Sequence, residues 1–115
     1  MEALILVGIG GAIGSLMRFW LSRLQPIRDI PAGTLAVNVS GSLAISLLAF
    51  SNISSQEYAF FCTGIMGGYT TFSTFSFETF RLLEDKLYPA AIANILLNVV
   101  GSLAGVFIGY LLIIR

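Results

Sequence analysis

The chain has 115 residues, of which 57% are hydrophobic and only 10% are charged, whereas a soluble domain carries roughly 25% charged residues. Six basic and six acidic side chains give a formal net charge of zero and no sign of a nucleic-acid partner. The chain has no histidine and a single cysteine, which excludes Ser/His and Cys/His catalytic pairs and metal sites built on imidazole or thiolate ligands. We therefore predict a membrane protein that is not an enzyme.

Four long segments of the chain have no charge. The uncharged runs cover residues 3–17, 30–56, 58–77 and 87–114, and each is near or above the roughly 20 residues that cross a bilayer core. We predict an all-α membrane protein whose residues 1–115 form a single four-helix transmembrane domain, with spans at about 3–24, 34–50, 58–83 and 90–114. Four short helices enclose little space, which predicts an oligomer.

The first predicted span is rich in glycine and ends near an arginine. Gly10 and Gly14 form a GxxxG spacing, which is typical of close helix packing in membranes. Arg18 is either an interfacial anchor or part of an entrance to a pathway. The run has no basic segment before it and is no more apolar than the later ones, so we interpret it as a retained helix and not as a signal peptide.

The third predicted span contains an unusual segment, GIMGGYTTFSTFSFETF, at 64–80. Gly67 and Gly68, followed by two β-branched threonines, predict a break in the helix at this point. Non-helical backbone at membrane depth must be buried in protein or line an aqueous cavity, and its freed carbonyls can coordinate a hard cation such as sodium.

Aromatic, hydroxyl and acidic side chains follow the predicted break. Phe72 and Phe75 lie three residues apart and share a helix face. Their rings either pack against lipid or core, or offer their positive edges to a desolvated anion. Ser73 and Thr74 supply hydroxyl donors on a neighbouring face. Glu78 is a functional candidate because it is a carboxylate inside a span, although its ionisation state stays open.

Two further spans present neutral polar side chains. Asn38 lies in the second span, and Asn94, Asn98 and Ser102 form a stripe at four-residue intervals in the fourth. Such residues often bridge helices in membranes, which is one interpretation of the stripe. The other is a pathway for a small anion that sheds water, because neutral donors without fixed charge suit an anion better than a cation.

The chain resembles the Fluc family of fluoride channels, also called CrcB proteins, over essentially its whole length. The matching segments are GGAIGSLMRF at 10–19, GTLAVNVSGS at 33–42, GIMGGYTTFSTFSFE at 64–78 and NILLN at 94–98. The resemblance implies a passive, fluoride-selective channel in the plasma membrane of a microbe. Such a channel lets fluoride leave the cytoplasm and lowers its toxic concentration there.

The resemblance also implies an inverted (antiparallel) dimer with a structural sodium ion at its centre. Backbone carbonyls of the broken third helix hold this ion, and we assign them to Gly67 and Thr70. Asn94 departs from the family, because many members have tyrosine at that place. With Arg18 added as an entrance residue, the predicted fluoride pathway consists of Arg18, Asn38, Phe72, Ser73, Thr74, Phe75, Glu78, Asn98 and Ser102.

The sequence leaves alternatives open for the partner in the dimer and for the class of protein. Four basic residues lie on the side of the first and third loops and only Arg115 lies opposite, which favours termini outside the cell. Two inverted copies would need balanced loops, so an oppositely oriented paralogue is the alternative to the homodimer that we prefer. The alternatives to a channel are a small proton-coupled multidrug exporter, which needs a carboxylate in the first span, and a non-conducting assembly subunit.

Overall fold

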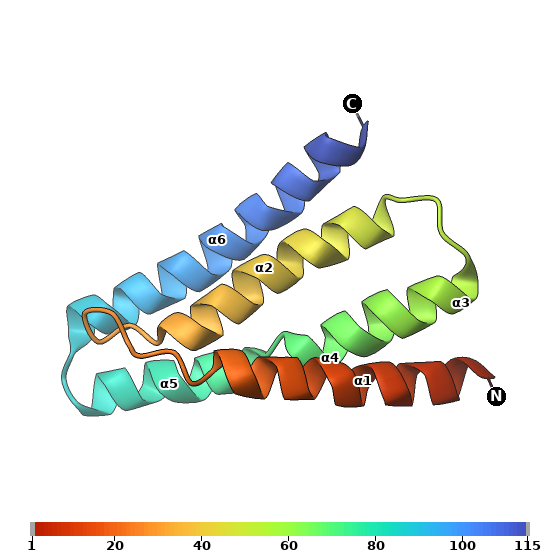
Figure 1. Ribbon diagram of the computed structural model, residues 1–115. Helices are drawn as coiled ribbons and strands as arrows, with labels where there is room; N and C mark the ends of the chain where they lie inside the picture. The colour runs from red at the N-terminus through yellow and green to blue at the C-terminus, as the bar shows by residue number, and fades with distance from the viewer. Residues whose placement is uncertain (1, 115) are drawn as a thin grey trace.

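The computed structural model describes residues 2–114, most of which lie in helices (Figure 1). Three helices are long, namely α1 (Glu2–Leu21), α2 (Ala32–Ala49) and α6 (Tyr88–Ile114). Between α2 and α6 lie four shorter helical segments, α3 (Ser55–Glu57), the π-helix η1 (Tyr58–Met66), α4 (Gly67–Tyr69) and α5 (Phe72–Glu84). These residues contain no strand, only an isolated bridge between Ile27 and Ile30. The prediction of an all-α protein is confirmed.

Three helices are long and apolar enough to cross a membrane. They are α1, α2 and α6, with mean hydropathies of 1.8, 1.5 and 2.2, and they coincide to within a few residues with the spans predicted at 3–24, 34–50 and 90–114. The span predicted at 58–83 is not one helix, because its residues are distributed over η1, α4 and α5. The membrane protein therefore has three continuous apolar helices and one interrupted helical run.

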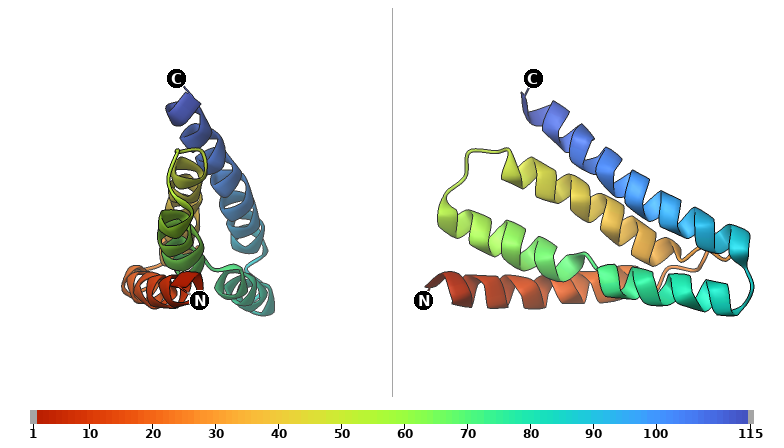
Figure 2. Two further views of the ribbon diagram at one scale, coloured as in Figure 1. Left: turned by 90° about the vertical axis from the view of Figure 1, so that its right-hand side faces the viewer. Right: turned by 180° about the vertical axis from the view of Figure 1, so that it is seen from behind.

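The helices pack as two pairs (Figures 1 and 2). α2 packs along α6, and α1 packs along η1 and α4. The start of α1, the end of α6 and the α2–α3 connection lie at one end of the molecule, and the α1–α2 and α5–α6 connections lie at the other. α5 continues from α4 towards the latter end and packs against α6. The interruption between α4 and α5 therefore lies away from both ends.

Glycines of α1 allow its close approach to η1 and α4. A Cβ atom added at Gly10 would lie 2.5 Å from the carbonyl oxygen of Phe60, and one at Gly14 would lie 2.9 Å from the backbone nitrogen of Tyr69 and would collide with the carbonyl of Ile65. These distances leave no room for a side chain, since carbon atoms in ordinary contact are at least about 3.5 Å apart. The GxxxG spacing of the first span is confirmed as a close helix contact.

Candidate functional site

The interruption between α4 and α5 falls at two threonines. Thr70 (φ −78°, ψ 155°) and Thr71 (φ −150°, ψ 118°) are extended, whereas Gly67 and Gly68, where the break was predicted, are still helical. Gly68 lies against the backbone of Gly11 in α1, so packing holds that turn in helical form. Threonine accepts extended backbone readily because it is β-branched. The predicted break exists, but it begins three residues later.

A side chain, and not a helix, satisfies the backbone N–H of Thr71. Its N–H donates to Asn38 Oδ1 (2.9 Å), and Asn38 Nδ2 donates to its carbonyl oxygen (3.0 Å). Thr71 is only 6% exposed, and each backbone group left unpaired there would cost about 1–3 kcal/mol. Asn38 of α2 therefore stabilises the extended backbone by replacing the hydrogen bond that the Thr71 N–H loses. It also adds a second bond to the Thr71 carbonyl, which accepts the first bond of α5 as well because Thr71 is the N-cap of that helix.

The four carbonyl groups of residues 67–70 lose their usual helical donors at the break, and those of Gly67 and Thr70 are among them. In a continuous helix the N–H of Thr71 would donate to the carbonyl of Gly67, and that of Thr74 to the carbonyl of Thr70. Instead, Thr71 N–H donates to Asn38, and Thr74 N–H donates to Thr71 Oγ1 (3.1 Å). Within residues 2–114 no group of three or more His, Cys, Asp or Glu side chains could hold a metal ion. Backbone oxygens at the break are therefore available to a cation.

Hydrogen bonds continue from Asn38 into α6 and α5. Asn38 Nδ2 also donates to Asn98 Oδ1 (3.0 Å), and Asn98 Nδ2 donates to the backbone oxygen and to Oδ1 of Asn94 (2.9 and 3.1 Å). Asn94 Nδ2 donates to Thr79 Oγ1 (2.9 Å), which donates to the carbonyl oxygen of Phe75 (2.8 Å). We call Asn38, Asn98, Asn94 and Thr79 the amide network. It connects the break to three helices.

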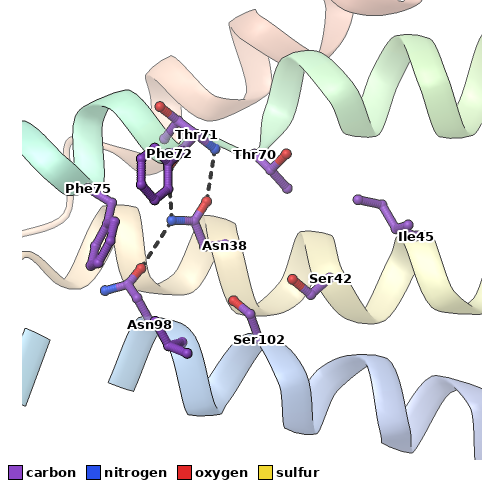
Figure 3. A pocket seen from close by; sticks show the side chains of 10 residues that line it. Asn38, Ser42, Ile45, Thr70, Thr71, Phe72, Phe75, Asn98 and Ser102 are labelled. Carbon is purple, nitrogen blue, oxygen red and sulfur yellow. Dashed lines mark hydrogen bonds between the residues drawn. The ribbon is translucent and has the colours of Figure 1, made fainter. Parts of the chain in front are cut away.

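A cavity of about 310 Å³ opens beside the break (Figure 3). It is lined by residues of α2, the break, α5 and α6, and all of them are uncharged: Asn38, Ser42, Ile45, Thr70, Thr71, Phe72, Phe75, Asn98, Val99 and Ser102. Five of the nine predicted pathway residues line this cavity, namely Asn38, Phe72, Phe75, Asn98 and Ser102. The cavity can therefore offer hydroxyl groups and ring edges to a small anion, with no fixed charge on its wall.

The two phenylalanines at the cavity form a tilted pair. Their ring centroids are 5.7 Å apart, with an angle of 56° between the ring planes, and Figure 3 shows both rings among the side chains that line the cavity. Phe75 is buried within the chain, whereas Phe72 is 78% exposed. The Phe72 ring therefore leaves most of its surface for a contact outside this chain.

The amide network changes which donors face the cavity. The side-chain N–H groups of Asn38 and Asn98 are engaged with oxygens of the protein. The hydroxyl groups of Ser42 and Ser102, which Figure 3 shows between α2 and α6, are the side-chain donors that remain on this wall. Ser42 was not among the predicted pathway residues. The signal for it is its spacing, because it lies four residues after Asn38 on the same face of α2.

A second cavity, of about 400 Å³, shares Thr71 with the first. Its other lining residues come from α1, the segment that follows α1, α2 and α5: Ser15, Arg18, Phe19, Ser22, Thr34, Val37 and Thr74. Two more predicted pathway residues, Arg18 and Thr74, lie here, and Arg18 is the charged one among them. The structure therefore divides seven predicted residues between two cavities that meet at the break.

Two predicted pathway residues line neither of these cavities. Ser73 is exposed on α5, and its hydroxyl oxygen lies 3.4 Å from Thr71 Oγ1. Glu78 is half-buried, and its Oε1 is buried without a hydrogen-bond partner among residues 2–114. Asn94, which the sequence placed in the polar stripe but not in the pathway, is 1% exposed and belongs to the amide network. In the polar stripe of α6, Asn98 and Ser102 therefore line the cavity, whereas Asn94 joins α6 to α5 through a hydrogen bond.

Comparison with known proteins gives one consistent family. The sequence model of the family described as CrcB-like protein, Camphor Resistance (CrcB), matches residues 5–110. One of the fluoride-specific ion channels of Methanosarcina acetivorans is 47% identical over 107 residues, which cover 92% of this chain and 96% of the relative. The fluoride-specific ion channel of Methanococcus maripaludis is 42% identical over 116 residues (96% and 95%), and that of Methanocaldococcus jannaschii is 43% identical over 114 residues (95% and 92%).

Proposed function

Because the chain belongs to the CrcB family, we propose that it is a fluoride-specific ion channel that lets fluoride leave the cytoplasm passively and so lowers its toxic concentration. The observation that carries this proposal is the cavity at the helix break, whose lining is uncharged and combines hydroxyl groups with a phenylalanine pair. Conduction of this kind needs no chemical turnover, so the protein is not an enzyme. The acidic residue of α1 is Glu2, at its first position, and the comparisons do not favour a proton-coupled exporter.

Selectivity in this proposal comes from the way the ion exchanges its water. Fluoride holds its water strongly, so a pathway must offer compact donors at close range. The hydroxyls of Ser42 and Ser102 supply hydrogen bonds, and the edges of Phe72 and Phe75 supply positive electrostatic potential without a fixed charge. Arg18, in the second cavity, attracts anions towards the break.

A structural sodium ion at the centre of the assembly is part of the proposal. The carbonyl oxygens of Gly67 and Thr70 would hold it, and their availability supports this, because the N–H groups that a helix would direct at them are bonded elsewhere. Oxygen ligands of this kind suit a hard cation. When bound, the ion would add a fixed positive charge next to a pathway whose own lining has none.

The assembly that we propose is an inverted dimer in the plasma membrane of a microbe. Exposed apolar side chains on α1, α5 and α6, including Phe72, support a surface that is covered by a second copy and by lipid. The basic residues at one end, namely Arg23 and Arg28 in the α1–α2 connection, Arg81 in the last turn of α5 and Lys86 in the α5–α6 connection, favour one orientation in the membrane. A second copy of the chain is the preferred partner, and an oppositely oriented paralogue is the alternative.

Efflux from liposomes tests the proposed function. Purified protein is reconstituted into vesicles loaded with potassium fluoride or potassium chloride, a potassium carrier is added, and the released anion is followed with a selective electrode. We expect rapid release of fluoride and none of chloride above protein-free vesicles, and equal release of chloride would contradict the proposal. Replacing all sodium by a large organic cation should slow fluoride release, whereas an unchanged rate would contradict the structural sodium ion.

A further inference from the structure

The hydrogen bonds of the amide network run in a single direction, from Asn38 to Asn98, Asn94 and Thr79. A primary amide has one acceptor oxygen and one nitrogen with two donors. Thr71 N–H fixes the oxygen of Asn38, and the nitrogen of Asn38 then requires an acceptor, which is Asn98 Oδ1. The orientation of Asn38 at the break therefore depends on the orientation of Asn98 in α6.

The next two members of the network determine how Asn98 is oriented. Its nitrogen can point away from Asn38 because two acceptors of Asn94 receive it. The nitrogen of Asn94 in turn donates to the hydroxyl of Thr79, which donates to the carbonyl of Phe75. If Asn98 turned over, two nitrogens would face each other and the bond to Asn38 would be lost. Hydrogen bonds in such a series also strengthen one another at low dielectric.

The two far members of the network lie outside the cavity at the break. Asn94 is 1% exposed and Thr79 is 8% exposed, and neither lines that cavity. Their loss would remove no donor from its wall, but it would release the orientation of Asn98, which does line it. We infer that Asn94 and Thr79 are positioning residues of the channel, which hold the break and the Asn98 amide in the conducting geometry through hydrogen bonds. This inference rests on the proposed function.

A pair of variants at one position isolates the hydroxyl from the bulk of the side chain. Thr79→Val removes the hydroxyl and keeps the size, whereas Thr79→Ser keeps the hydroxyl and loses only a methyl group. In the liposome assay we expect Thr79→Val to slow fluoride efflux per folded protein about tenfold, the effect of about one hydrogen bond to a buried group. Thr79→Ser should stay near the wild-type rate. Thr63→Val, at an exposed position of η1, is the matched control.

A second measurement reports on the break itself and needs no transport. The Thr71 amide proton should be protected from exchange with water in the wild-type protein in detergent micelles, as followed by nuclear magnetic resonance, although it lies between two helices. In Thr79→Val and in Asn94→Leu it should exchange about tenfold faster, with the amide of Val37 in α2 unchanged. A role in general stability alone would raise both exchange rates together.

The outcomes separate the two proposals. If the wild-type protein releases no fluoride, the proposed function is wrong and the inference falls with it. If the wild-type protein conducts and Thr79→Val conducts equally well, the inference is wrong and the proposed function stands. If neither Thr79→Val nor Asn94→Leu folds, a Thr71 amide that exchanges freely in the wild-type protein would still contradict the inference, because hydrogen bonds would then not hold the break.

Discussion

Replacement of Gly14 by alanine tests whether the close contact between α1 and the interrupted run holds the fold together. Gly14 is buried against η1 and α4, where an added Cβ would lie 2.9 Å from both the carbonyl carbon of Ile65 and the nitrogen of Tyr69. Gly8, two turns earlier on the same helix, has no atom within 4 Å of such a Cβ. Gly14→Ala and Gly8→Ala therefore form a matched pair that differs only in the space available.

The expected effects of the two variants have opposite signs. Alanine gains about 0.5–1 kcal/mol over glycine inside a helix, and this gain applies in full at Gly8. At Gly14 the clash is with backbone atoms that cannot rotate away, so α1 must move, and overpacking of this kind costs about 1–3 kcal/mol. The net loss at Gly14 is about 0.5–2 kcal/mol, and the two variants should differ by about 1–3 kcal/mol.

Reversible unfolding in mixed detergent measures this difference. The free energy of unfolding of each variant is compared with that of the wild-type protein under one set of conditions, with the helical circular dichroism signal as the readout. We expect Gly8→Ala to be more stable than the wild-type protein, and Gly14→Ala to be less stable. A Gly14→Ala protein as stable as Gly8→Ala would show that the glycine contact does not determine the packing of α1.

Three further substitutions test the site and the N-terminal cap of α3. Phe75→Ile should slow fluoride efflux about threefold to tenfold, from the roughly 0.5–1.5 kcal/mol of an oriented ring, and an unchanged rate in liposomes would remove that ring from the pathway. Asn38→Leu leaves the backbone N–H of Thr71 unpaired and should lower the free energy of unfolding by about 1–3 kcal/mol, which chemical unfolding would measure; a loss no larger than that of a surface variant would contradict the bridging role. Hydrogen bonds from the backbone N–H and then the hydroxyl of Ser54 hold the pKa of Glu57 below its ordinary 4.5. The ionised carboxylate therefore stabilises the fold at pH values above 4.5. This contribution to stability is lost as the pH falls through the lowered pKa of Glu57. Glu57→Gln should be less sensitive to acid between about pH 5 and pH 3 in unfolding measurements, and an identical acid profile would argue against the contribution.

The lengths of the uncharged segments were enough to predict the continuous helices. They could not predict where the third span would be interrupted or which kinds of helix it would contain. α1, α2 and α6 follow from apolar stretches that only a helix can satisfy in a bilayer. The π-helix η1 and the position of the break depend on contacts with another helix, since Gly68 is kept helical by its packing on Gly11. Local propensity favoured a break at the glycines, and tertiary packing moved it to Thr70 and Thr71.

The sequence was enough to predict which residues form the site, but not which of them hydrogen-bond to one another. The motif around the break and the polar stripe of the fourth span identify side chains that do meet at one cavity, such as Asn98 and Ser102. Helical spacing cannot show that Asn38 bonds to a backbone on another segment, because that contact joins residues 33 positions apart. It also gave no reason to connect Asn94 with Thr79, which meet only because α5 turns back against α6.

The geometry of the break links the stability of the fold to the selectivity of the proposed channel. Breaking the helix frees the carbonyls of Gly67 and Thr70, which a cation can use, but it also leaves the backbone of Thr71 to be satisfied by Asn38. The amide donors that stabilise the break are therefore not available to an anion, and hydroxyls and ring edges have to replace its water. Those groups compensate for lost hydration only in part, so the remaining stabilisation must come from positive charge outside the cavity wall. The proposed cation at the break and Arg18 in the adjoining cavity are the groups near the pathway that can supply it.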